Sequence, residues 1–225
     1  MERLNIKEFF SNDTWTCPAG VTALLVLGCG GGNGGWGGVK GVDIKGYTKG
    51  GSTSPILGIV SVIPNTSYSI IIGTGGTGGT GTTLNYVRDA QKGGNGSDSL
   101  FGSLFVFKGA ICGGRMCAIN DLYYNANQSC GGIYGTDGID FAPVFAWGGR
   151  GGAPGAFNDP VTGLYSIGGE GGAVGGDTQA PPAGNAPANT GAGGGSGGNG
   201  SGLKALPGGN GGNGGSGRIA IMWVE

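Results

Sequence analysis

A glycine run near the end of the chain repeats every three residues, and this spacing excludes the common regular structures. The run reads GGNGGNGGSG over residues 208–217, with glycine at two positions of every three. An α-helix needs a period of about 3.6 residues and a strand one of about 2.0, so neither explains the spacing. A polyproline II helix has about three residues per turn and rises about 3.1 Å per residue. Two edges of such a helix would carry no side chain and could touch neighbouring backbones, while the third would present Asn210, Asn213 and Ser216.

The same spacing recurs in blocks that are separated by apolar segments. An isolated glycine helix cannot recover the entropy that glycine loses on folding, so we expect the blocks to form a bundle. We predict a single domain, residues 1–225, with an all-β and irregular fold and almost no α-helix. It would combine a small antiparallel β scaffold, a bundle or sandwich of polyglycine II helices, and intervening loops for recognition. The scaffold would comprise residues 1–27, 56–72, 99–111 and 218–225, and the helices residues 28–38, 73–81, 148–155, 168–176, 191–202 and 208–217.

Apolar segments between the glycine blocks predict the strands. Residues 21–27 are almost wholly apolar, which is typical of a strand buried on both faces. Residues 56–63 and 67–72 flank a Pro-Asn pair, and this pattern predicts a β-hairpin. Residues 99–111 predict a strand pair or one bent strand, and residues 218–224 (RIAIMWV) predict a last apolar strand.

Composition favours a folded domain over a disordered chain. Glycine supplies 59 of the 225 residues, a content that is often associated with low complexity. The apolar fraction is nevertheless 37%, the net charge is only −1, and the glycines are phased. The 10 prolines are too few for collagen. Disorder is therefore the weaker alternative.

Charge, hydropathy and cysteine content limit the partners and the compartment. A net charge of −1 argues against a general electrostatic attraction to nucleic acid. No apolar run reaches the roughly 18 residues of a membrane span, so we expect no membrane insertion. The first residues, MERLNIKEFF, lack the pattern of a secretory signal peptide. We expect assembly in a cytoplasm with the five cysteines reduced, although pairing between any of them stays open.

The residue inventory argues against catalysis. The chain has no histidine, which removes the usual general base and most zinc sites. Ser196 lies in a G-x-S-x-G pattern, but a nucleophile elbow also needs a base, and a glycine tract produces this pattern by chance. Cys112, Cys117 and Cys130 are spaced unlike a zinc motif. We predict that the protein is not an enzyme and holds no cofactor and no metal.

One glycine block carries threonine on its third edge. Thr74, Thr77 and Thr80 would lie about 9.3 Å apart in a polyproline II helix, a spacing that resembles the rows of ice-binding proteins. A solvated helix edge is the simpler interpretation, because the other blocks do not repeat the threonines. Ice binding is the more remote alternative for the function.

Aromatic residues gather in the connectors between the glycine blocks. Rigid amphipathic rings among Asn, Ser and Gly are typical of recognition loops, since they bury area at low entropic cost. The alternative is that the larger aromatics, especially Phe145 and Trp147, cap the core of the bundle. The candidate receptor-binding residues are Tyr47, Tyr86, Tyr123, Tyr124, Tyr134, Phe157 and Tyr165.

Four motifs, taken in order, resemble the glycine-rich domain of bacteriophage tail proteins. They are TWTCPAGVTALLVLGCGGGNGG, PNTSYSIIIGTGGTGGTG, GGNGSDSLFGSLFVFKGA and GGNGGSGRIAIMWV, and together they span nearly the whole chain. The chain is also similar to the glycine-rich adhesins at the distal tips of T-even-type long tail fibres. It departs from these adhesins in having no obvious separate fibre-attachment domain.

The resemblance implies a polyglycine II sandwich whose variable end loops bind a bacterial surface receptor, either an outer-membrane protein or a glycan. It further implies a non-enzymatic tip adhesin, assembled in the host cytoplasm and displayed on the virion, with a fibre or other virion protein as its mount. A homotrimer is an open arrangement, since the domain would need its own means of docking. The alternative is a structural virion component, in the tail, the fibre or the capsid decoration, that binds no receptor.

Overall fold

The computed structural model describes residues 3–38, 46–47, 53, 56–83, 91–110, 117–118, 182–195, 197 and 207–225. Throughout these residues the chain forms strands, turns and extended segments, with no helix. The expectation of an antiparallel β scaffold without α-helix is confirmed for this part of the chain. The strands are β1 (Leu4–Phe9), β2 (Asp13–Thr16), β3 (Ala23–Cys29), β4 (Gly46–Tyr47), β5 (Ile56–Ser61), β6 (Ser67–Ile71), β7 (Ser99–Phe101), β8 (Phe105–Phe107), β9 (Cys117–Ala118) and β10 (Arg218–Val224).

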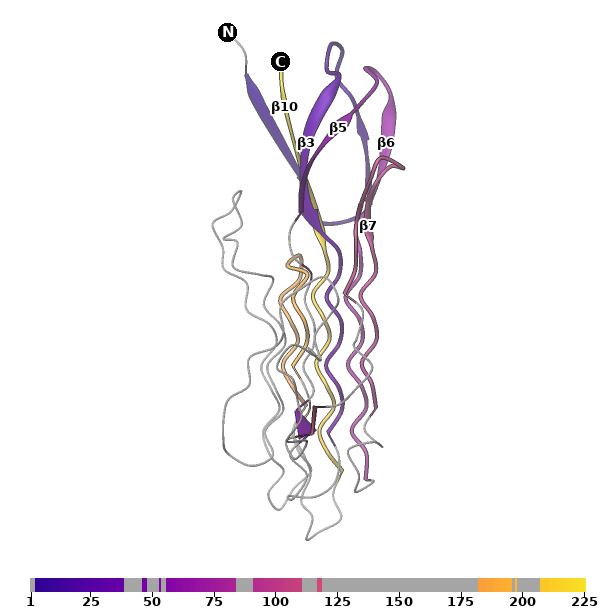
Figure 1. The fold of residues 1–225 in the computed structure, drawn as a ribbon, viewed down its shortest axis with the longest axis vertical. Coiled ribbons are helices and arrows are strands. Elements are labelled where there is room, and N and C mark those ends of the chain that lie inside the picture. Colours follow the sequence, from indigo (N-terminus) through magenta and orange to yellow (C-terminus); the bar gives the residue numbers. More distant parts are fainter. Residues whose placement is uncertain are drawn as a thin grey trace.

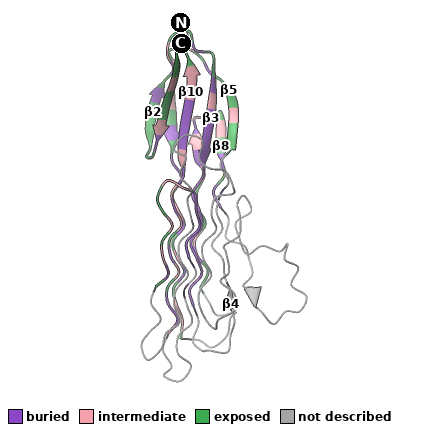
Figure 2. Ribbon diagram, turned by 90° about the vertical axis from the view of Figure 1, so that its left-hand side faces the viewer, coloured by how far each residue is buried: buried purple, intermediate pink, exposed green. Residues whose placement is uncertain are grey.

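Two four-stranded antiparallel sheets lie at one end of the molecule (Figure 1). The first has the strand order β1-β10-β3-β5, and the second has the order β2-β6-β7-β8. Because β1 pairs with β10, the two ends of the chain lie side by side, on the far side of the sheets from the glycine-rich segments. Strands β4 and β9 form a separate pair toward the opposite end of the molecule (Figures 1 and 2).

The hydrophobic core lies between the two sheets. Strands β3 and β10 turn alternate residues inward, as expected for strands with a period of two. The aromatic rings of Trp15 and Trp223 approach to 5.5 Å between centroids and join the second sheet to the first. The first sheet contributes Leu24, Val26, Ile219 and Ile221 to the core, and the second contributes Trp15, Ile70, Phe101 and Phe107.

Within β3, burial on both faces is confined to the second half of the strand. Val26, on the core side, and Leu27, on the opposite side, are both buried, while Ala23 at the start of the strand is exposed. The apolar run therefore marked the strand correctly. In its first half, Val21 and Leu24 are buried, whereas Thr22 and Ala23 are exposed.

The predicted hairpin of residues 56–63 and 67–72 is wrong. Strands β5 and β6 form at these positions, and Asn65 between them has a positive φ of 58°, but the two strands do not pair. β5 pairs with β3 in the first sheet, and β6 pairs with β2 and β7 in the second. Val60 and Ile70 have to reach the core from opposite sides. The Cys17 N–H donates to the Thr66 carbonyl and the Asn65 N–H donates to the Cys17 carbonyl, and these bonds hold the crossing. The turn therefore carries the chain from one sheet to the other.

Glycine-rich segments run side by side away from the sheets, along the long axis of the molecule (Figure 1). We term the described segments 30–38, 73–83, 91–97, 182–197 (without 196) and 207–217 the glycine array. Neighbouring segments bond to each other at every third residue. The N–H groups of Gly31, Gly34 and Gly37 donate to the carbonyls of Ser97, Gly94 and Gln91, each at 2.9 Å. The donor numbers rise as the acceptor numbers fall, so these two segments are antiparallel.

Segment 30–38 bonds to neighbours on more sides than a strand can. Gly32, Gly35 and Gly38 donate to segment 207–217, while carbonyls of segment 30–38 accept from segments 73–83 and 191–197. A strand has hydrogen-bonded neighbours only along its two edges. The segment therefore lies in the interior of a three-dimensional backbone network.

The run 208–217 has the bare edges that its sequence predicts. Gly211, Gly214 and Gly217 donate to segment 73–83 at 2.8 Å, and Gly212 and Gly215 donate at 2.8 Å to residues 195 and 192. A Cβ atom at Gly212 or Gly214 would overlap the carbonyl of a neighbouring segment. Backbone thus meets backbone along both glycine edges.

The third edge of the same run also contributes to cohesion. The Asn213 Oδ1 atom accepts the N–H of Gly78, and the Asn210 Oδ1 atom accepts the N–H of Gly81, both at 2.9 Å. These side chains thus accept N–H groups of the neighbouring segment. Asn210 and Asn213 therefore stabilise the array although they are exposed to solvent.

Residues 182–187 join the array, although the predicted glycine blocks did not include them. Ala183 and Ala186 donate to the carbonyls of Asn210 and Asn213 at 2.8 Å, again three residues apart. The segment reads PAGNAP, and proline fixes φ near the polyproline II value. Proline content was therefore the signal that a search for glycine alone missed.

Ser99 joins the array to the sheets. Its side chain is fully buried, and its Oγ atom donates to the Cys29 carbonyl and accepts the Gly73 N–H, both at 2.8 Å. One hydroxyl thus connects the ends of β3 and β6 with β7, where strands change into glycine segments.

Candidate functional site

The end of the glycine array that lies away from the sheets is the candidate functional site. Here Gly37 donates to Gln91, Gly38 to Gly209, and Thr82 to the Gly38 carbonyl, at 2.8 to 2.9 Å. These bonds bring four segments of the array together at their described ends. We term this the loop end.

Two of the predicted binding residues belong to connectors that reach the loop end. Tyr86 follows Thr83 and precedes Gln91, so its connector starts and finishes there. Tyr47 lies in β4, where its backbone pairs with Cys117 of β9. Figure 2 places β4 toward the same end. The structure brings the residues that flank the Tyr86 connector and the β4–β9 pair to one end, opposite the chain termini.

The remaining candidates lie outside the described residues. They are Tyr123, Tyr124, Tyr134, Phe157 and Tyr165, as well as Tyr86 itself and the side chain of Tyr47. Phe145 and Trp147, the suggested caps of the bundle core, also lie outside, as do glycine blocks 148–155 and 168–176. Their roles stay predictions.

The threonine row lies on an exposed side of the array. Thr74, Thr77 and Thr80 are all exposed, and Asn210 and Asn213 are exposed beside them. The two rows are neighbours because the asparagine side chains bond to the segment that carries the threonines. The sequence did not show this pairing, since Asn213 and Gly78 are 135 residues apart.

Asp98 and Lys108 form an ion pair where the array meets the sheets. The Lys108 Nζ atom lies 2.8 Å from Asp98 Oδ2, and the Gly109 N–H donates to Oδ1 at 2.8 Å. Burial by itself raises the pKa of Asp98. The hydrogen bonds from Lys108 and Gly109, with the charge of Lys108, outweigh burial and hold that pKa below its ordinary value.

Cys17 is a structural thiol. Its side chain is buried, its Sγ–H donates to the Val21 carbonyl at 3.3 Å, and burial raises the pKa of the thiol. A raised pKa keeps the sulfur protonated at neutral pH, which disfavours nucleophilic chemistry. Neither Cys17 nor Cys29 forms a disulfide bond.

The described residues hold no cluster of three or more His, Cys, Asp or Glu side chains that could bind a metal ion. Within the same residues, no helix has the length and apolar character to cross a membrane. Ser196, Cys112 and Cys130 lie outside them, and Cys117 is described only through its backbone.

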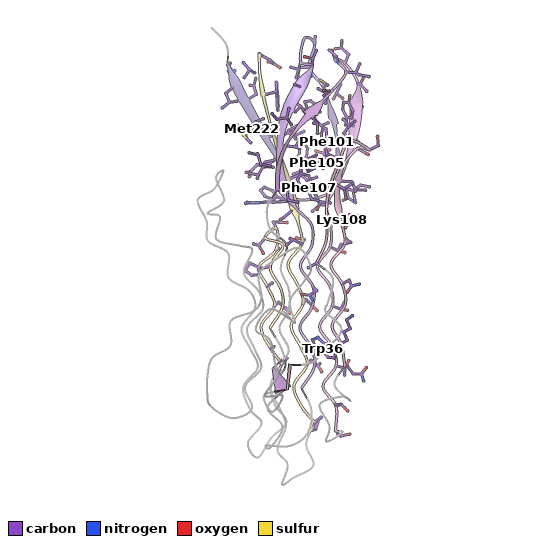
Figure 3. The ribbon with its side chains drawn as sticks, viewed as in Figure 1. Trp36, Phe101, Phe105, Phe107, Lys108 and Met222 are labelled. Carbon is purple, nitrogen blue, oxygen red and sulfur yellow. The ribbon has the colours of Figure 1, made fainter. Side chains whose placement is uncertain are left out.

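Sequence reasoning did not flag two buried polar side chains on one edge of segment 30–38. Asn33 is fully buried and Trp36 is 8% exposed, and in the described structure neither the Asn33 amide atoms nor Trp36 Nε1 has a hydrogen-bond partner. Figure 3 shows Trp36 within the array, far from the aromatic cluster of Phe101, Phe105 and Phe107 in the sheets. Tryptophan is therefore tolerated inside the array, where two of its three edges remain glycine.

These features define a class of all-β protein in which two small sheets support an array of glycine-rich segments joined through their backbones. The chain belongs to the glycine-rich domain family, whose family model matches residues 8–224. A comparison with curated proteins finds no match.

Proposed function

We propose that the segments of the glycine array are polyglycine II helices. With about three residues per turn, successive N–H groups point in three directions, and each direction repeats at every third residue. The donors of segment 30–38 follow this rule: residues 31, 34 and 37 bond to one neighbour, and residues 32, 35 and 38 bond to another. Hydrogen bonding on several sides is the behaviour expected of such helices.

We propose further that the protein is a non-enzymatic receptor-binding protein of a bacteriophage, displayed at the tip of a tail fibre. It would recognise an outer-membrane protein or a glycan on the bacterial surface through the connectors at the loop end. Membership of the glycine-rich domain family and the four motifs that resemble phage tail proteins support this proposal.

One observation supports it above the others: hydrogen bonds gather the connector ends at the loop end, while both termini lie at the opposite end. Gly38, Thr82 and Gly209 meet there through backbone bonds alone. A mount at the sheets would therefore leave the connectors free to contact a receptor. Segment 30–38 would hold them about 28 Å from the sheets by the polyproline II rise.

The array and the connectors would have separate roles, because different atoms form them. Backbone groups and glycine edges form the network, so the connectors can change sequence without altering it. Tyrosine rings in those connectors would supply rigid contact area at low entropic cost, with hydrogen bonding from the hydroxyl group.

The test is an exchange of residues 118–146 for the corresponding connector of another member of the family. We expect phage adsorption to shift to a different host range, while the thermal unfolding midpoint of the purified protein stays the same. A matched control replaces Thr74, Thr77 and Thr80 with serine on the side of the array, and it should adsorb as the parent does. Unchanged adsorption after several folded connector exchanges would rule the proposal out.

The alternative for a phage virion protein is a structural component that binds no receptor. It requires that neighbouring subunits cover the loop end in the assembled particle. Imaging of intact particles distinguishes the two, because an adhesin leaves Tyr47 and Tyr86 facing solvent.

Ice binding has one observation in its favour, the exposed threonine row with an exposed asparagine row beside it. The Asn210 and Asn213 oxygens already accept backbone hydrogen bonds, which reduces their capacity to order water. Thermal hysteresis of the purified protein tests this function directly. Thermal hysteresis that is present in the parent protein and disappears in Thr77→Val would support ice binding over adhesion.

A further inference from the structure

β5 is one of the two edge strands of the first sheet, and its own sequence carries none of the usual protections of an edge. Natural proteins protect edge strands with charges, prolines, bulges or short length, because an open edge pairs with other chains. In the two described sheets, β1 contains Lys7 and Glu8, β2 contains Asp13, and β8 has only three residues. β5 reads ILGIVS, six residues without charge or proline, and Figure 2 shows it exposed at the margin of the sheets.

Alternate backbone groups of β5 point away from the sheet. Val62 donates to Thr22 at 2.9 Å, so by the antiparallel alternation the even-numbered residues of β5 bond to β3. The N–H and C=O groups of Leu57, Ile59 and Ser61 therefore point away from β3, in the plane of the sheet. No described residue forms a hydrogen bond with them.

The same residues also expose apolar side chains. Ile59 is 77% exposed and Leu57 is 58% exposed, both on the outer face of the sheet. The strand registers continue this row from Ile59 through Leu25 and Met222 to Ile6. Leu25 and Met222 are half-buried, while Ile59 and Ile6 at the two ends of the row are exposed. An apolar row of this kind on a sheet surface can mark an interaction site.

We infer that β5 pairs with β5 of a second copy of this chain, antiparallel and about a two-fold axis at Ile59. This register places Ile59 against the partner's Ile59 and Leu57 against the partner's Ser61, and each opposed pair exchanges two backbone hydrogen bonds. Identical strands meet without repulsion because β5 carries no charge. Paired β-branched side chains add to the stability of the contact. The inference does not depend on the adhesin proposal.

Symmetry favours this arrangement over pairing of β5 with β1 of another copy. A contact between two copies of one strand closes at two molecules, whereas a contact between different strands produces rings, such as a trimer, or open filaments. Lys7 and Glu8 also make β1 a poorer partner for an uncharged apolar strand. We therefore expect a dimer that joins the two first sheets into one continuous sheet.

The experiment is sedimentation analysis of the full chain and of charge variants over a range of concentrations. We expect the parent protein to be a dimer and Ile59→Lys to raise the dimer Kd by about tenfold or more, since two like charges then oppose each other. Ile59 is largely exposed, so the variant should fold normally. An equal mixture of Ile59→Lys and Ile59→Glu should restore the dimer. The matched control, Leu4→Lys, changes an exposed residue of β1 and should remain dimeric.

Amide exchange gives a second readout. The N–H groups of Leu57, Ile59 and Ser61 should exchange slowly in the dimer and fast in Ile59→Lys. A monomeric or trimeric parent, or an Ile59→Lys protein that dimerises as the parent does, would overturn the inference.

Discussion

A single β-carbon is often more than a position in the glycine array can hold. At Gly96 a Cβ would overlap the Gly31 carbonyl, whereas at Gly94 the nearest atoms are Thr77 Oγ1 at 3.0 Å and Thr77 N at 3.1 Å. Two glycines of one segment therefore have different reasons to be glycine. Both residues are simply glycines of one block in the sequence, and only their packing reveals that one tolerates a side chain better than the other.

Alanine substitutions at these two positions should differ in effect. We expect Gly96→Ala to lower the free energy of unfolding by about 3 kcal/mol, because two backbones would have to separate. Gly94→Ala should cost about 1 kcal/mol or less, since the threonine hydroxyl can move and the contact with Thr77 N is tight without overlap. Denaturant titration of both variants measures the difference, and equal losses would contradict the packing described.

Asp98 makes stability depend on pH. Its pKa in the folded protein lies below the ordinary value of about 3.9, so its contribution is complete above that value and is lost as the pH falls through the folded pKa. Asp98→Asn should therefore lower the thermal midpoint at neutral pH, and the deficit should shrink below about pH 4. Asp13→Asn, which alters an exposed ion pair with Lys7 at 3.6 Å, is the control and should change little at either pH.

At the scale of elements, most strands follow from the sequence, but their pairing does not. Apolar runs locate β3, β10 and the β7–β8 pair, because a short apolar run between turn or glycine residues is a local signal. Turn residues at Asn65 correctly mark a reversal, yet they do not say which sheet receives each strand. That choice depends on the core, where Val60 and Ile70 meet from opposite sides.

The packing of the glycine segments depends on the three-residue period of their sequence. Inserting one glycine between Gly214 and Gly215 would shift residues 208–214 by one position, and Asn210 and Asn213 would then lie on an edge with no room for a side chain. Inserting Gly-Asn-Gly at the same point keeps the phase and places the new asparagine on the same edge as Asn210 and Asn213. We expect the single insertion to lower the thermal midpoint far more than the triple one, as measured by calorimetry. The reverse order would contradict a period of three.

At the scale of the whole molecule, the sequence predicts a β scaffold with glycine blocks and recognition connectors, but not their arrangement. The meeting of connector ends at the loop end results from bonds such as Gly38 to Gly209, between residues far apart in the chain. No local pattern carries that information. Tyr47 and Tyr86 could be chosen as candidates by composition alone. The position of β4, and of the residues that flank the Tyr86 connector, opposite the termini required the structure.

The pairing of β1 with β10 has a mechanical consequence. Both termini leave the molecule at the same end, and the array extends away from them along one axis. A pull on the loop end, resisted at the termini, therefore acts parallel to the glycine segments and perpendicular to their hydrogen bonds. Many bonds would share this shear load at once, instead of opening one after another. We expect the molecule to resist axial tension better than a force that peels one segment sideways.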